Sequence, residues 1–299
     1  MSTRLKIKYL WLLRQMGRKS VISKSVFGFP YRISLGDNFS ENPFYNKYSN
    51  TGEILATAAW VTGQKKPVVF DIGGHCGFIA TQLAGILKPD HPAIYSVEPV
   101  APTFTDLVES VRTLSLQEYI YPVPVALNDQ PGFVKLNYSR HNSMLAQIIP
   151  EEGASNQRSG SETHIAPAET LDEFCKTTGH PDVIKIDVEG WEVHILQGAA
   201  AMLASDRFVH TGICFEWNPQ ALADVGSTAA EFAAFFRDHR IFYLNDYEGQ
   251  KLSELSEVTD LAGVKHVCNC FAIHRQCDRV NEWKENYEKL KAKYRVRVS

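Results

Sequence analysis

Two short stretches decide the fold: "VVFDIGGHCG" at residues 68–77 and "IKIDVEGWE" at residues 184–192. In each, an apolar run stops at an acidic residue with a glycine shortly after it. Such runs are typical of strands covered on both faces in a parallel sheet. Ligands bind such sheets outside the carboxyl ends of the strands, where the strand order reverses. We therefore expect both stretches to line one crevice.

Outside these stretches, apolar runs alternate with segments of helical spacing. Strands are expected at 93–99, 121–129, 210–217, 241–246 and 266–274, and helices at 50–63, 78–87, 103–114, 169–179, 193–205 and 228–240. This alternation predicts an α/β fold with a doubly wound, Rossmann-like sheet and helices on both faces. Residues 130–163 are polar and broken by Gly and Pro, and we expect a short strand and a loop over the site there.

Three parts of the chain are distinguished by composition. Residues 1–66 are interpreted as a basic N-terminal extension, with helices and a lead-in strand or hairpin at 26–35. Residues 67–275 form the core, and residues 276–299 a charged amphipathic helix on the surface or against a partner. The net charge of -3 gives no reason to expect a nucleic-acid partner.

The first residues are strongly basic, with no acidic residue before Asp37. Their apolar stretch Tyr9–Leu13 is too short to span a bilayer or to serve as the apolar part of an export signal. It favours either a solvated helix that covers part of the core or a helix lying on an anionic membrane surface.

The six cysteines show no disulfide framework, so we expect reduced thiols. The expected location is the cytoplasm, either free or at the membrane surface through the basic N-terminus. His266, Cys268, Cys270 and His274 alternate as on one face of a strand. Because the turn-based spacing of zinc ligands is absent, we interpret them as buried strand residues and predict no metal.

The first stretch has the residue types of a nucleoside site. Gly73, Gly74 and Gly77 allow a tight turn and close approach of a ligand, and Glu98 at the end of the next strand can accept from ribose hydroxyls. The spacing D-x-G-G-x-x-G differs from the pyrophosphate-binding G-x-G-x-x-G. The additional carboxylate of Asp71 favours a cofactor with positive charge, such as a sulfonium bearing an amino group.

Several segments together resemble the FkbM-type S-adenosylmethionine-dependent methyltransferases. They are "VVFDIGGHCGFIA", "YSVEPVAPTFTDL", "PVALNDQPG" and "ETLDEF…DVIKIDVEGWEVHILQGA", across residues 67–218. The resemblance implies the class I methyltransferase fold, with seven strands of which the last is antiparallel. It also implies S-adenosylmethionine as cofactor and O-methylation of a sugar, glycolipid or related secondary metabolite. His75 departs from the family pattern, which more often has Asn there.

The resemblance also implies roles for single residues. Gly73 and Gly77 would cradle the methionine part of the cofactor, and Asp71 would contact its amino end directly or through water. Glu98 would hold the ribose. Asn128 or Asp129, after the third strand, would lie near the adenine, unless the pair is only a turn before Pro131 and Gly132.

Methylation of a hydroxyl needs an aligned nucleophile and a destination for its proton. Asp187 is the first candidate to orient or deprotonate the acceptor, Glu189 the second, and His75 also has a suitable intrinsic pKa. The alternative is that Asp187 and Glu189 hold a divalent metal, but only two close carboxylates are visible. Lys185, expected to be buried, needs a carboxylate partner, for which Glu216 is the candidate.

Two other classes of function stay open. A non-catalytic relative would use the pocket to bind a nucleoside or the terminal helices as a scaffold. A nicotinamide-dependent oxidoreductase would share the fold and Glu98, but the glycine spacing and "KIDVEGWE" disfavour it. The sequence predicts a small-molecule or glycan acceptor without identifying it, and it does not predict the oligomeric state.

Overall fold

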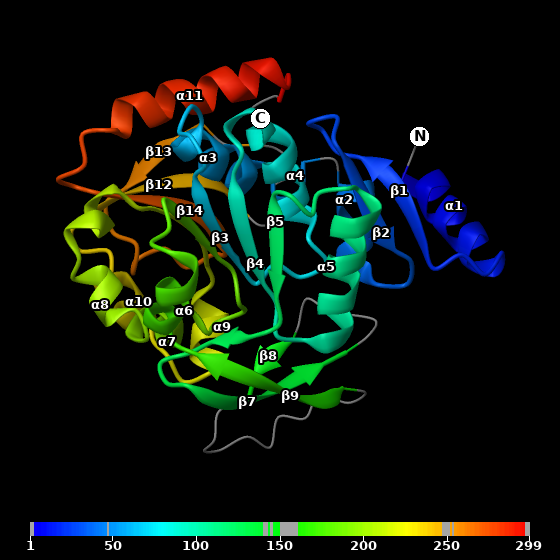
Figure 1. The fold of residues 1–299 in the computed structure, drawn as a ribbon, viewed down its shortest axis with the longest axis horizontal. Coiled ribbons are helices and arrows are strands. Elements are labelled where there is room, and N and C mark those ends of the chain that lie inside the picture. The colour runs from blue at the N-terminus through cyan, green and yellow to red at the C-terminus, as the bar shows by residue number, and fades with distance from the viewer. Residues whose placement is uncertain are drawn as a thin grey trace.

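A computed structural model describes residues 3–46, 48–139, 143, 146–149, 161–246, 252 and 254–296. Its main sheet has eight strands in the order β13-β12-β14-β11-β10-β3-β4-β5 (Figure 1). They are β3 (Val68–Ile72), β4 (Ala93–Val97), β5 (Ile120–Val123), β10 (Val183–Ile186), β11 (Gly212–Trp217), β12 (His239–Asp246), β13 (Ser256–Val258) and β14 (Cys268–His274).

The strand directions confirm the predicted sheet. Strands β10, β11, β3, β4 and β5 pair in parallel, and β14 runs antiparallel to both β11 and β12. The prediction of seven strands is short by one, because the three-residue β13 adds an edge strand beside β12. The order reverses between β3 and β10, so the two sequence stretches end at the switch point.

Helices cover both faces of this sheet. One face carries α3 (Thr51–Val61), α4 (Phe78–Leu87), α5 (Ala101–Thr113) and α11 (Val280–Lys293), and the other carries α6 (Leu171–Thr178), α7 (Glu192–Gln197), α9 (Pro219–Asp224) and α10 (Ala229–Ala234). Each face of the sheet packs into its own hydrophobic core. Alternate strand residues point to opposite cores, so Val69 packs on the side of α3 and Phe70 on the side of α6. Short helices α8 (Ala200–Leu203), η1 (Lys88–Asp90) and η3 (Asp206–His210) complete the connections.

Helix α3, grouped with the N-terminal extension by composition, is buried along its whole length. It packs on β10, β11, β12 and β14 and against α11. The indole of Trp283 on α11 donates to the carbonyl of Ala56 at 3.0 Å and stacks on Phe271 of the sheet. The C-terminal helix, expected at the surface, therefore has one face in the core.

The chain between β5 and α6 forms a second, four-stranded sheet, which lies at the lower edge of Figure 1. It contains β6 (Ala126–Leu127), β7 (Gly132–Tyr138), β8 (Gln147–Ile148) and β9 (Glu162–Glu169), in the order β6-β9-β7-β8. The single strand predicted at 121–129 is wrong: it divides into β5 and β6 around Pro124, which has no N–H for a ladder. The loop expected within 130–163 is largely outside the described residues.

One predicted helix is also divided. The segment 193–205 forms α7 and α8, with Gly198 between them. A Cβ at Gly198 would lie 2.1 Å from the carbonyl oxygen of Asn128, so close packing against that backbone requires glycine.

The N-terminal residues form α1 (Thr3–Gln15), the hairpin of β1 (Ser20–Lys24) and β2 (Pro30–Ser34), and α2 (Asn38–Tyr45). The hairpin begins earlier than the predicted 26–35 because Phe27 and Gly28 lie in its turn. Arg32 fastens β2 to α5 through ion pairs with Asp106 and Glu109. Within the described residues, no helix is long and apolar enough to cross a membrane, and all six cysteines are free thiols.

Candidate active site

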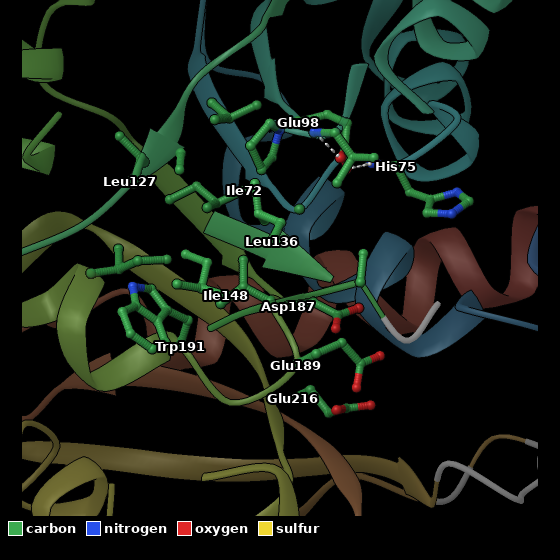
Figure 2. Close-up of a pocket in the computed structure, with 18 of the residues that line it drawn as sticks. Ile72, His75, Glu98, Leu127, Leu136, Ile148, Asp187, Glu189, Trp191 and Glu216 are labelled. Carbon is green, nitrogen blue, oxygen red and sulfur yellow. Dashed lines mark hydrogen bonds between the residues drawn. The ribbon is translucent and has the colours of Figure 1, made fainter. Parts of the chain in front are cut away.

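A pocket opens at the carboxyl ends of β3, β4, β10 and β11, with an empty volume of about 950 Å³ that includes its part open to solvent. Figure 2 shows that its two sides differ. The apolar lobe is formed by Ile72, Leu127, Leu136, Ile148 and Trp191. The acidic side is formed by Glu53, Asp187, Glu189 and Glu216. Gly73, His75 and Glu98 also line the pocket.

Lys185 joins the two strand ends under the pocket. Its ammonium lies 3.7 Å from Asp71 Oδ1 and 3.4 Å from Asp187 Oδ2, and it donates to the carbonyl of Gly73 at 3.2 Å. Burial disfavours the ammonium, but the carboxylates of Asp187 and Asp71 outweigh burial and raise the pKa of Lys185. The prediction that Lys185 pairs with Glu216 is wrong, because Lys185 pairs with Asp71 and Asp187.

Asp71 itself is fully buried and is not among the lining residues. Its Oδ2 accepts from the hydroxyl of Ser96 at 2.9 Å. The structure thus gives Asp71 the position of a structural counter-ion to Lys185. Its predicted contact with the amino end of a cofactor stays a prediction, for which access through a water or a side-chain shift is needed.

The glycine turn brings backbone to the pocket floor. Gly73 lies at φ 78°, and a Cβ there would be 1.9 Å from the carbonyl oxygen of Asp187. No other residue fits between β3 and β10 at that point. Of the three predicted glycines, only Gly73 lines the pocket; Gly74 packs on Ser96, and Gly77 is the N-cap of α4 and packs against Leu107.

Glu98, directly after β4, is fixed by the turn it faces. Its Oε2 accepts from the backbone N–H of His75 at 3.0 Å and its Oε1 from that of Val100 at 2.8 Å. Burial raises the pKa of Glu98 to about 7, and these two hydrogen bonds oppose the rise. Each oxygen can accept another hydrogen bond, so a diol at the edge of the apolar lobe would find two acceptors.

Asn128 and Asp129 lie behind the apolar lobe rather than in its wall. Asn128 Oδ1 accepts from the indole N–H of Trp191 at 3.0 Å. Asp129 lies 4.0 Å from the imidazole of His194, whose ring stacks on Trp191. The preceding Ala126 and Leu127 line the pocket instead. The predicted adenine contact of Asn128 or Asp129 stays untested, and in this structure Asn128 orients Trp191.

Asp187 and Glu189 point into the acidic side (Figure 2). Their loop is held from two directions, since Glu192 accepts from the backbone N–H of Val188 and Gln147 of the second sheet donates to the carbonyl of Glu189 at 2.8 Å. Glu189 has a left-handed backbone, φ 54°. Such a conformation is uncommon outside glycine and often marks functional loops.

Two further carboxyl groups on the acidic side were not predicted as site residues. Glu53 of α3 is 2% exposed and accepts from Asn50 at 3.0 Å through Oε1, while its Oε2 has no hydrogen-bond partner among the residues that the structure describes. Glu216 of β11 is 5% exposed and accepts from Asn218. Burial raises the pKa of both, and for Glu216 the charges of Asp187 and Glu189 add to the rise.

The ring of His75 is turned away from the acidic side in Figure 2. Its Nε2 shares a 2.6 Å hydrogen bond with the hydroxyl of Ser143, which donates to Asp37 at 2.6 Å. Burial lowers the pKa of His75 to about 3, so the ring stays neutral. Its predicted role in proton transfer is not tested; its observed contacts hold the pocket rim to the start of α2.

The fold and the pocket define the class of this protein: an α/β protein with a pocket at the switch point of its sheet. Residues 71–242 match the family model described as the methyltransferase FkbM domain. The chain therefore belongs to the FkbM methyltransferase family, as its motifs predicted.

Solved structures with similarity to this chain include a methyltransferase FkbM from Methylobacillus flagellatus KT, at 14% identity and a TM-score of 0.42 over 69% of this chain and 43% of that chain. An S-adenosylmethionine-dependent methyltransferase from Agrobacterium tumefaciens matches at 9% identity and a TM-score of 0.42 over 87% and 71%. An O-methyltransferase from Thermotoga maritima matches at 10% identity and a TM-score of 0.37 over 87% and 78%. No curated protein sequence matches the chain.

The family gives S-adenosylmethionine as the cofactor, and the pocket residues fit it. The apolar lobe suits an aromatic base, Glu98 is a buried acceptor for a diol, and the acidic side suits a sulfonium. No cluster of three or more metal-binding side chains occurs in the described part of the chain. The chain thus belongs to a family of S-adenosylmethionine-dependent methyltransferases.

Proposed function

We propose that this methyltransferase acts on a hydroxyl group of a polyhydroxylated acceptor, a sugar or a sugar-bearing molecule. The observation that carries the proposal is the convergence of Asp187, Glu189 and Glu216 on one side of a pocket whose other side is apolar. Hydroxyl groups donate hydrogen bonds, and ionised carboxylates only accept them. An acceptor with several hydroxyls suits this side, whereas a carboxylate or phosphate would meet like charge.

Bound S-adenosylmethionine supplies an electrophilic methyl group on a sulfonium. Asp187 would orient the acceptor hydroxyl and take its proton as the methyl group passes from sulfur to the hydroxyl oxygen; the S–CH₃ bond breaks, its electron pair stays on sulfur, and neutral S-adenosylhomocysteine is left. The Lys185 ammonium, 3.4 Å from Asp187 Oδ2, fixes the carboxylate. Glu189 accepts a neighbouring hydroxyl, and Glu98 accepts from the ribose. The proton leaves on Asp187, whose side chain is 22% exposed and can pass it to water.

Calorimetric titration tests the cofactor, with S-adenosylhomocysteine as ligand and NADH as control. We expect binding of S-adenosylhomocysteine alone. Binding of NADH alone would contradict the assignment, and binding of neither would favour a non-catalytic relative.

The variant Asp187→Asn tests the chemistry with an acceptor found by screening glycans and glycolipids. General-base catalysis contributes roughly 10²–10⁴-fold, so we expect turnover to fall by that factor while the dissociation constant for S-adenosylhomocysteine changes little. The exposed Asp206, on η3, provides the control Asp206→Asn. Full turnover in Asp187→Asn would overturn this role.

A further inference from the structure

Exposed large apolar side chains are concentrated at one place, the N-terminal helix α1 and the residues just after it. Within the described residues, seven of the ten such side chains belong to the first 22 positions: Leu5, Ile7, Tyr9, Trp11, Leu12, Met16 and Ile22, each 43–66% exposed. Soluble proteins scatter exposed apolar residues singly, and a concentration marks an interaction surface.

Basic side chains separate these apolar residues into stripes. Leu5, Tyr9 and Leu12 follow one another at helical spacing on one stripe of α1, and Ile7 and Trp11 form another. Arg4 and Lys8, also exposed and one turn apart, lie between the two stripes. No acidic side chain occurs in α1, and Arg18 and Lys19 follow it.

The opposite side of α1 is fixed to the body of the protein. Leu10 is fully buried, Lys6 donates to the carbonyl of Phe44 at 2.6 Å, and Arg14 pairs with Glu41. Tyr9 also contacts the Phe44 ring, at 6.3 Å between centroids. Because α1 is anchored to α2 through one side, its exposed stripes face solvent. The helix itself lies at the edge of the molecule (Figure 1).

We propose that this surface of α1 docks on an anionic lipid bilayer. Apolar stripes flanked by lysine and arginine match the interface, where alkyl and indole groups enter the acyl boundary and the cations meet lipid phosphates. A symmetric contact with a second copy would bring the same basic face against itself, and like charges oppose it. The charge pattern therefore selects the membrane.

The docked helix is connected to the pocket through its anchor. Asp37 precedes α2 and accepts from Ser143, which bonds to the pocket residue His75. A membrane-bound α1 is thus linked through α2 to the pocket rim, and this link favours a lipid-linked acceptor. This consequence rests on the proposed function, whereas docking itself is tested without cofactor or acceptor.

Vesicle co-sedimentation of the full chain, with tryptophan fluorescence, tests the proposal. Vesicles of phosphatidylcholine alone are compared with vesicles containing phosphatidylglycerol. Trp11 is 56% exposed, while Trp60, Trp191, Trp217 and Trp283 are each at most 8% exposed, so a change in emission reports on α1. We expect binding and a blue shift only with anionic vesicles, and weaker binding as salt increases.

Two pairs of variants identify the surface. Each basic residue near an anionic membrane contributes about 1 kcal/mol, so Arg4→Glu with Lys8→Glu should weaken binding at least about tenfold. Trp11→Ser with Leu12→Ser should abolish it. The matched apolar control is Phe133→Ser with Ile165→Ser, since these side chains are 78% and 69% exposed on the second sheet. The matched charge control is Lys176→Glu with Lys289→Glu.

Failure to bind anionic vesicles would overturn the proposal, as would equal loss in the control variants. Sedimentation velocity without lipid tests whether a second copy of the chain, rather than a membrane, covers this surface. A concentration-dependent dimer that is lost in Trp11→Ser with Leu12→Ser, without vesicle binding, would assign the surface to a second copy instead.

Discussion

The two sides of the pocket are built differently. The cofactor side, which comprises Gly73, Glu98 and the apolar lobe, has Gly73 and Glu98 at adjacent strand ends, and both carboxylate oxygens of Glu98 accept from backbone N–H groups. The acidic side collects Glu53, Asp187 and Glu216 from three elements far apart in the chain. Among the described residues, Glu53 Oε2 has no hydrogen-bond partner, so the two sides differ in how fully their carboxylates are hydrogen-bonded.

Substitution of Glu98 should give the largest loss of cofactor affinity and so the clearest difference between the two sides of the pocket. Hydrogen bonds to charged groups contribute about 1.5–3 kcal/mol, so loss of the ribose acceptor in Glu98→Ala should weaken S-adenosylhomocysteine binding roughly 10- to 100-fold. Calorimetry measures this effect. Glu189→Ala, on the acidic side, serves as the comparison and should raise the acceptor KM while leaving intact the affinity for S-adenosylhomocysteine, which lacks the sulfonium charge. Equal effects of both variants on cofactor affinity would remove the distinction.

Glu53 tests whether the acidic side is built for a ligand at the expense of stability. An unpaired buried acceptor costs about 1–3 kcal/mol, so Glu53→Leu should raise the free energy of unfolding by roughly 1 kcal/mol while it lowers kcat/KM for the acceptor. Glu53→Gln keeps the shape and should show a smaller change in both. Denaturant titration and steady-state kinetics measure the two quantities. A destabilised Glu53→Leu with unchanged kinetics would mean that Glu53 is purely structural.

The sequence predicted part of each side of the pocket for a physical reason. Short apolar runs, glycine turns and strand-end carboxylates are local signals, and they correctly indicated the sheet and the lining positions of Gly73, Glu98 and Asp187. Glu53 gave no such signal, because its helix was grouped with the basic extension and only the packing of α3 on the sheet brings it to the pocket. The partner of Lys185 was mispredicted because parallel register places Asp71 directly across from it.

The second sheet was missed for a related reason. In its longest strands, β7 and β9, buried and exposed residues alternate. Several of the exposed positions carry polar residues, so the sequence of this segment is typical of a polar loop. The non-local pairing of Ala126 with Ala168 and of Leu136 with Ile148 decides its form. It supplies Leu136 and Ile148 to the apolar lobe, so part of the cofactor side is also non-local.

Acidity of the pocket gives a pH prediction. Burial raises the pKa of Glu98 and Glu192 from 4.5 to about 7, so between these values the folded chain binds more protons than the unfolded chain. The contribution of these two groups to stability then falls as pH rises through that window. Burial lowers the pKa of His75 to about 3 and that of His239 to about 4, so these two groups act in the opposite direction. The variant Glu98→Gln isolates the glutamate: the denaturant midpoint of the wild type relative to that of Glu98→Gln should decrease from pH 5 to 7. A difference that increases over this range would contradict the raised pKa of Glu98.

The charge of the ligand sharpens the same comparison. S-adenosylmethionine carries a sulfonium, whereas the thioether of S-adenosylhomocysteine is neutral. As the acidic side ionises, attraction to the sulfonium increases. The ratio of the affinity for S-adenosylmethionine to that for S-adenosylhomocysteine should therefore increase with pH. A ratio independent of pH would place the sulfonium away from Asp187, Glu189 and Glu216.

Asn128 should have the smallest effect, and it distinguishes the predicted adenine contact from the observed one. Its Oδ1 accepts from Trp191, and its side chain does not line the pocket. A neutral hydrogen bond contributes about 1 kcal/mol, so Asn128→Ala should lower the free energy of unfolding by that order and weaken S-adenosylhomocysteine binding only a few-fold.

The double-mutant cycle of Asn128→Ala with Trp191→Phe decides between the two roles. Phenylalanine keeps an aromatic wall but has no indole N–H, so it removes the same hydrogen bond from the other side. If Asn128 acts through Trp191, the second substitution adds little to the first in both stability and affinity. If Asn128 instead bonds to the adenine, the two losses in affinity add, and an analogue altered at its adenine amino group would bind wild type and Asn128→Ala equally.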